Sequence, residues 1–257
     1  MQACSVLAFD WDLCRPYFFV PVILMLGGVV RGATGFGGAM VMILPLSRIL
    51  SLSEAIALSL FLELFGPLML IKSAVRMVQS NVSGQRLLLA FTGWAILGLP
   101  IGLVLQGGLD TVLVGSLMSL AIMSIASMML LGWKVLPKPS LWATRGVGFG
   151  CGTLIAMTGI GGPIAAIYFL RGFGDSRLPR SMMHLFVSVM SITTLAGMVI
   201  GGLVKSHIFL GMLAGLPIYV FASWLGQRLS DRLSPEVLKN ASLVLILLGS
   251  AVFFISQ

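Results

Sequence analysis

Two glycine-rich elements of the same form are the residues in this sequence best suited to contact a ligand. The stretch TGFGG covers residues 34–38, and TGIGG covers residues 158–162, 124 positions further along the chain. Three glycines in five residues leave little helix propensity, so each element predicts a break in the backbone. A break exposes amide groups, and glycine lets a ligand approach those amides closely.

Each break precedes a segment that restarts a helix, near Ala39 in the first copy and near Pro163 in the second. Proline suits a helix start because it has no N–H to leave unpaired. The N-terminus of a helix favours negative charge, through its free amides and its dipole. We therefore predict an anion-binding site at both breaks, made of Thr34, Gly35, Phe36, Gly37, Gly38, Thr158, Gly159, Ile160, Gly161, Gly162 and Pro163, with the threonines as hydroxyl donors. The alternative is that these glycines only permit close helix packing.

Three ionisable residues lie inside apolar stretches and are further candidates for this site. Arg31 precedes the first break by three residues, where the second copy has Ile155. Its guanidinium would neutralise a bound anion or cap the carbonyls of the helix that ends near Val30. Glu63 and His184 are candidates to accept a coupling proton. The alternatives are a salt bridge between Glu63 and Arg31, and a backbone hydrogen bond from His184 at a membrane edge.

The composition places all of these residues in a membrane protein. The chain has 257 residues, of which 58% are hydrophobic and 9% charged, and its mean hydropathy is +1.07. A soluble domain needs far more charged surface, and membrane-barrel strands would alternate apolar with polar residues. The net charge of +8 lies mostly in short turns, where it sets membrane orientation. We expect no nucleic-acid partner, and the three cysteines and two histidines lack the spacing of a metal or redox motif.

Eight apolar segments predict an all-α polytopic membrane protein. They cover residues 17–50, 53–78, 84–105, 110–132, 142–171, 179–203, 206–225 and 236–255. Six of them have the length of one membrane crossing, whereas the first and fifth are longer and contain the breaks. The tetrapeptide GLPI also occurs twice, at 98–101 and 215–218, in the same order relative to the breaks. We predict two repeats, 1–134 and 135–257, each with one broken or re-entrant helix and three transmembrane helices.

The distribution of lysine and arginine predicts how these repeats are oriented. If all eight segments crossed the membrane, the two faces would carry 8 and 7 basic residues. If the first and fifth segments were re-entrant, one face would carry 12 and the other 3, as the positive-inside rule requires. The re-entrant arrangement makes the repeats inverted, as in many secondary transporters, with both termini in the periplasm. A broken helix that still crosses the membrane fits the segment lengths as well.

The two glycine breaks and their flanks resemble the TauE/SafE sulfite exporter family. The similarity is sharpest in RGATGFGGAMVMILPL (31–46) and GTLIAMTGIGGPIAAIYFL (152–170). It implies a protein of the bacterial inner membrane that moves sulfite, sulfonates such as sulfoacetate, or other organic anions. It also implies that the glycines of both breaks belong to the substrate region. Many relatives carry a further glycine where this chain has Ala39 and Pro163.

We therefore expect a secondary transporter that moves a small, sulfur-containing anion by alternating access around the two breaks. An anion channel, or a carrier for a non-sulfur anion such as a carboxylate, remains open from the sequence. We expect no enzyme and no cofactor, because the chain has neither an H-E-x-x-H nor a P-loop motif and its Asp110, Asp175 and Asp231 lie at loop edges. The expected partners are the anion, the lipid bilayer and a coupling proton or sodium ion. The oligomeric state stays open, a homodimer being one alternative.

Overall fold

The computed structural model describes residues 19–35, 37–66, 68–130, 136–174 and 177–230, together with Val244 and Leu247. In these ranges the fold is all-helical, with ten helices and no strand. Apart from Val244 and Leu247, the predicted segment 236–255 lies outside the described residues, as do both chain termini. Three of the described helices are long and apolar enough to cross a membrane, and they cover Val82–Gly108, Arg177–Ile200 and Ile208–Leu229.

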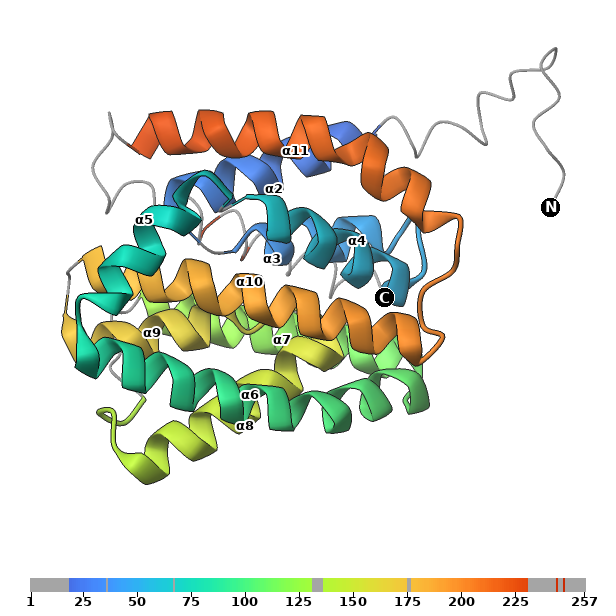
Figure 1. The fold of residues 1–257 in the computed structure, drawn as a ribbon. Coiled ribbons are helices and arrows are strands. Elements are labelled where there is room, and N and C mark those ends of the chain that lie inside the picture. Colours follow the sequence, from blue (N-terminus) through green and yellow to red (C-terminus); the bar gives the residue numbers. More distant parts are fainter. Residues whose placement is uncertain are drawn as a thin grey trace, which may run out of the picture.

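The helices follow the predicted apolar segments along the chain (Figure 1). The described helices in the first predicted repeat, 1–134, are α2 (Val20–Thr34), α3 (Gly38–Leu46), α4 (Leu52–Phe65), α5 (Leu68–Gln79), α6 (Val82–Gly108) and α7 (Thr111–Leu130). Those in the second, 135–257, are α8 (Leu141–Thr158), α9 (Gly162–Phe173), α10 (Arg177–Ile200) and α11 (Ile208–Ser230).

One predicted segment differs from the structure, because residues 53–78 do not form one continuous helix. They are divided between α4, which ends at Phe65, and α5, which begins at Leu68. The sequence Gly66–Pro67 between them explains the division, since proline has no N–H and its ring crowds the preceding turn. Because of this division, Glu63 lies near the end of α4 and beside the first break, rather than in the middle of one long helix.

Each broken segment folds back on itself as a helical hairpin. In the first, Gly38 and Met42 of α3 pack on Gly27 of α2. In the second, the Tyr168 hydroxyl of α9 lies 2.8 Å from the Thr144 hydroxyl of α8. The outer ends of α2 and α3 lie at the right of Figure 1, and those of α8 and α9 at the left. The two hairpins therefore enter the bundle from opposite ends.

Each hairpin is held by a long helix from the other part of the chain. Helix α2 packs along α11, and α8 packs along α6, and these are the two most extensive helix contacts in the described structure. Glycines at the crossings bring the backbones together: a Cβ on Gly32 would overlap the Ser223 carbonyl, and one on Gly152 would overlap the Ala95 carbonyl. Small residues at helix contacts are typical of membrane bundles, because close backbone approach increases van der Waals packing there.

The outer surfaces of the long helices are apolar. Val104 on α6 is 73% exposed and Leu210 on α11 is 77% exposed, while the aromatic rings of Phe91, Phe169 and Phe186 pack together inside. Exposing such residues to water would cost free energy, whereas contact with the apolar lipid chains does not. The exposed faces are those of a membrane protein.

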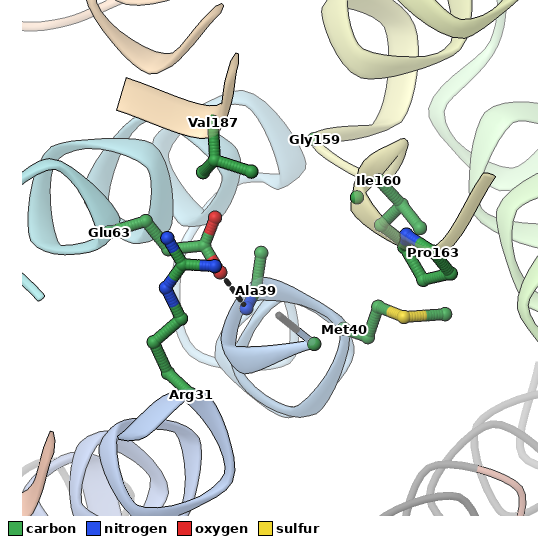
Figure 2. Close-up of a pocket in the computed structure, with 10 residues that line it drawn as sticks. Arg31, Ala39, Met40, Glu63, Gly159, Ile160, Pro163 and Val187 are labelled. Carbon is green, nitrogen blue, oxygen red and sulfur yellow. Dashed lines mark hydrogen bonds between the residues drawn. The ribbon is translucent and has the colours of Figure 1, made fainter. Parts of the chain in front are cut away.

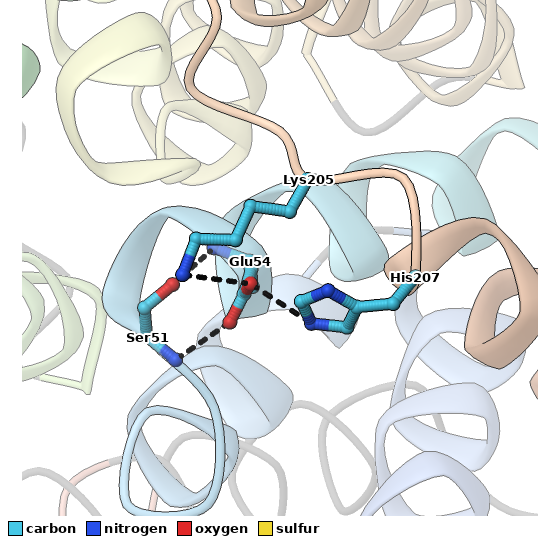
Figure 3. Close-up of polar contacts among 4 residues, drawn as sticks. All are labelled: Ser51, Glu54, Lys205 and His207. Carbon is cyan, nitrogen blue, oxygen red and sulfur yellow. Dashed lines mark hydrogen bonds and ion pairs between the residues drawn. The ribbon is translucent and has the colours of Figure 1, made fainter. Parts of the chain in front are cut away.

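A polar cluster joins the turn before α4 to the loop between α10 and α11 (Figure 3). The Glu54 carboxylate, which is nearly buried, accepts a hydrogen bond from the Ser51 amide at 3.0 Å and completes a capping box at the start of α4. The same carboxylate lies 3.1 Å from His207 Nε2 and 3.9 Å from Lys205 Nζ. These contacts tie the outer end of the first hairpin to the start of α11.

We expect the glycine crossings to tolerate no side chain. Gly152→Ala should lower the stability by about 1–3 kcal/mol, because the added methyl group meets the Ala95 backbone, which cannot move aside. Gly150→Ala in the same helix is the matched control, since a Cβ there meets nothing within 4 Å. The midpoint of thermal unfolding in detergent measures both changes. Equal midpoints for the two variants would contradict the proposed tight crossing.

Candidate functional site

The two breaks begin with the same backbone geometry. Gly35 and Gly159 both have left-handed angles, with φ of +83° and +73°. Their amides return to the carbonyls of Arg31, at 2.8 Å, and Ile155, at 2.7 Å, which closes the last turn of α2 and of α8. A residue with a side chain is strained at such angles, which explains why glycine stands at both positions.

The helices that restart after the breaks begin near the residues that the sequence predicts. Helix α3 begins at Gly38, next to Ala39, and α9 begins at Gly162, which puts Pro163 at its second position. The internal hydrogen bonds of α3 start with the Val41 amide, so three earlier amides point out of its N-terminus. One amide fewer is available in α9, because proline has none.

The N-terminus of α3 already holds a carboxylate. The Ala39 amide donates a hydrogen bond of 2.9 Å to Glu63 Oε1, and the Glu63 side chain is almost completely buried. Glu63 comes from α4, so this bond joins two helices rather than capping its own. The predicted alternative role of Glu63 was a salt bridge with Arg31, and the hydrogen bond that the structure gives it goes instead to the backbone of the first break.

Residues from both breaks line one small cavity (Figure 2). The first break contributes Gly37, Ala39 and Met40, and the second contributes Gly159, Ile160, Gly162 and Pro163. Arg31, Glu63 and Val187 complete the lining. The second break also packs directly on α3, because a Cβ on Gly159 would overlap the Ile43 side chain.

Arg31 is the charged residue that the sequence predicts beside the first break, and it is 2% exposed. Its Nη1 group donates to the Gly35 carbonyl, which satisfies a carbonyl at the end of α2. Its Nη2 group has no hydrogen-bond partner among the described residues. One side of the guanidinium therefore supports the break, while the other keeps a donor available at the cavity.

His184 lies on α10 against the same break rather than at an exposed edge. It is 7% exposed, and neither ring nitrogen has a partner in the described part of the chain. A Cβ on Gly35 would lie 3.6 Å from His184 Cε1 and 3.6 Å from Arg180 Nε, so both side chains face that glycine. Two arginines and the histidine therefore surround the first break.

The two threonines of the breaks use their hydroxyl hydrogens inside their own helices. Thr34 Oγ1 donates to the Val30 carbonyl at 2.8 Å, and Thr158 Oγ1 donates to the Leu154 carbonyl at 2.7 Å. The Thr158 oxygen also accepts from the Ile160 amide at 3.2 Å, which pairs a backbone group of the second break. Of the predicted site residues, Phe36 lies outside the described residues.

Tyr219 is a fully buried residue of α11 beside the first break, and it is absent from the site that the sequence predicts. A Cβ on Gly38 would lie 2.9 Å from the Tyr219 hydroxyl and 3.0 Å from Arg31 Cβ. The hydroxyl has no partner among the residues that the structure describes. One signal was present in the sequence: Tyr219 directly follows the second GLPI tetrapeptide, and a polar aromatic residue inside an apolar segment is unusual.

The fold and these breaks define an all-helical membrane protein whose polar groups converge on one buried cavity. The chain belongs to the sulfite exporter TauE/SafE family, because the model of that family matches residues 20–253. This is a family of transporters, so the chain is a membrane protein of transporter type. Comparison with curated proteins and with solved structures found no match.

We expect Thr158 to be needed for the stability of the second break. Thr158→Val removes the acceptor of the Ile160 amide and should cost about 1–3 kcal/mol, because a buried amide is left unpaired. Thr193→Val in α10 is the control, since that hydroxyl bonds only to carbonyls of its own helix. Thermal unfolding in detergent compares them. A loss as large in the control as at Thr158 would argue against a specific role for this hydroxyl.

Proposed function

We propose that this protein is a secondary transporter of a small anion that contains sulfur, such as sulfite, sulfoacetate or another organosulfonate. Transport proceeds by alternating access around the two helix breaks, across the inner membrane of a bacterium. The observation that carries this proposal is the convergence of two helix N-termini and the buried Arg31 on one cavity. Each of these features favours negative charge in a medium that screens it weakly.

The charge balance around the cavity supports an anion rather than a cation. Arg31 lines it, and Arg180 faces the break beside it, whereas Glu63 is the single acidic residue among its lining residues. An arginine this deeply buried is costly unless a partner or ligand uses its charge. A tetrahedral or trigonal oxyanion of sulfur offers several acceptors to the amides, to Arg31 Nη2 and to the Tyr219 hydroxyl.

Alternating access is supported by how the hairpins pack. Each hairpin lies against a long helix from the other half of the chain, α2 on α11 and α8 on α6. This reciprocity fits two inverted repeats, residues 1–134 and 135–257, related by an axis through the cavity. Because the cavity is small, a substrate enters only after the helices around it move, which favours a carrier over an open channel.

The positions of the basic residues support the re-entrant topology. The ends of α5, α9 and α11 and the starts of α8 and α10 lie at one end of the bundle, and the end of α3 and the loop between α10 and α11 lie at the opposite end (Figure 1). The sequence at the first end includes Arg76, Lys138, Arg171, Arg177 and Arg228, and that at the opposite end includes Arg48 and Lys205. The positive-inside rule then puts the first end in the cytoplasm. The hairpin of α2 and α3 enters from the periplasm, the hairpin of α8 and α9 enters from the cytoplasm, and both chain termini are periplasmic.

Flux of sulfite and methanesulfonate into proteoliposomes tests this function. We expect saturable uptake that is stimulated by counter-flow in the wild type and lost in Arg31→Gln, because that change removes the positive charge at the cavity. Arg86→Gln is the matched control, since Arg86 is exposed at the start of α6 and should transport normally. Acetate and neutral dimethyl sulfone complete the panel. Preference for acetate would favour a carboxylate carrier, uptake of the neutral sulfone alone would refute an anion site, and non-saturable conductance would indicate a channel.

A further inference from the structure

Glu63 stands where a bound anion is expected. Its carboxylate oxygen accepts the Ala39 amide at 2.9 Å at the N-terminus of α3, a helix of nine residues, and it lines the cavity with Arg31 and Gly37 (Figure 2). A carboxylate and a small oxyanion use the same groups at a helix N-terminus, namely free amides and the positive end of the dipole. Glu63 and a substrate anion therefore compete for one position.

The groups around Glu63 have more donors than this one carboxylate uses. Arg31 Nη2 and the Tyr219 hydroxyl are both deeply buried and have no partner among the described residues. Arg31 lines the cavity, and the Tyr219 hydroxyl lies at the start of α3, because a Cβ on Gly38 would lie 2.9 Å from it. Buried donors are normally paired, so their excess indicates a site built for a ligand with more acceptors than Glu63 supplies.

The remaining titratable groups near this site are basic or neutral. From the helices packed around the end of α4 come Arg31 of α2, His184 and Arg180 of α10, and Tyr219 of α11. If an anion bound while Glu63 stayed ionised, two negative charges would lie side by side in a buried cavity. Two adjacent negative charges in a buried cavity repel each other strongly, and a carboxyl group relieves this repulsion when it takes up a proton.

We propose that Glu63 is an internal competitor that occupies the substrate position in the empty transporter, and that it takes up one proton from solvent when an anion displaces it from Ala39. One proton then accompanies each anion, and the direction of net flux follows their combined gradients. This inference rests on the proposed anion site, and it assigns to that site the coupling ion and the residue that carries it.

Glu54 provides a matched comparison within the same protein. It is also a nearly buried glutamate bonded to a backbone amide near a helix N-terminus, but its amide is that of Ser51, the N-cap of its own helix, and it pairs with His207. Glu63 instead reaches the first residues of a different helix at the cavity. A purely structural cap would make the two glutamates respond alike to substitution, whereas an internal competitor would make them differ.

The test measures binding of methanesulfonate, whose charge stays constant between pH 5 and pH 8, by titration calorimetry on purified protein. In the wild type we expect affinity to rise by up to about tenfold for each pH unit of acidification over the range in which Glu63 is ionised, with uptake of about one proton per anion. Glu63→Gln keeps the shape but not the charge, so its affinity should be at least about tenfold higher at pH 8 and independent of pH. Glu54→Gln should behave as the wild type does.

A pH dependence that survives in Glu63→Gln would assign the proton to another group, such as His184, and would overturn the inference. Titration of the wild type in two buffers of different ionisation enthalpy measures the number of protons taken up per anion without any variant. Sulfonate binding without proton uptake would leave the proposed function standing and refute the role of Glu63. Proton-linked binding of acetate alone would keep that role and refute the sulfur specificity. No binding of either anion to either protein would refute both.

Discussion

The fold is organised by the need to pair backbone groups where two helices break inside an apolar bundle. Lipid offers no hydrogen bonds, so every N–H and C=O group freed at a break needs a partner from the protein or a ligand. At the ends of α2 and α8, the amides of the left-handed glycines Gly35 and Gly159 pair with carbonyls of the last turn, and the Arg31 guanidinium donates to the Gly35 carbonyl. The backbone amides around the starts of α3 and α9 have different partners, and this difference distinguishes the two sides of the candidate site.

The two breaks begin with the same left-handed glycine but differ in charge. The second break pairs its Ile160 amide with the neutral Thr158 hydroxyl, has Ile155 where the first has Arg31, and loses one amide to Pro163. The first break carries the buried Arg31 and the carboxylate of Glu63. In a fold with two similar hairpins, the charged chemistry therefore lies on one side of the cavity, while the other side supplies shape and close backbone approach.

Close helix crossings connect this site to the rest of the bundle. Helix α11 packs on α2 through Gly28, Gly32 and Gly226, and it also carries Tyr219 to the first break. The start of α11 is in turn fixed to the turn before α4 through His207 and Glu54. A movement of α11 relative to α2 would change the surroundings of Arg31 and Glu63 together. The packing thus links helix motion to the electrostatics of the cavity.

The sequence by itself determined the membrane class, the positions of both breaks and the presence of Arg31 beside the first break. These features follow from residue type over a few neighbouring positions. Glycine-rich elements break helices and long apolar segments require lipid wherever they occur in the fold. Only the tertiary structure decided that Glu63 bonds to Ala39 and that Tyr219 faces Gly38. The partners in both contacts are distant in the chain, and their pairing depends on how α4 and α11 pack around the first hairpin, which no local pattern encodes.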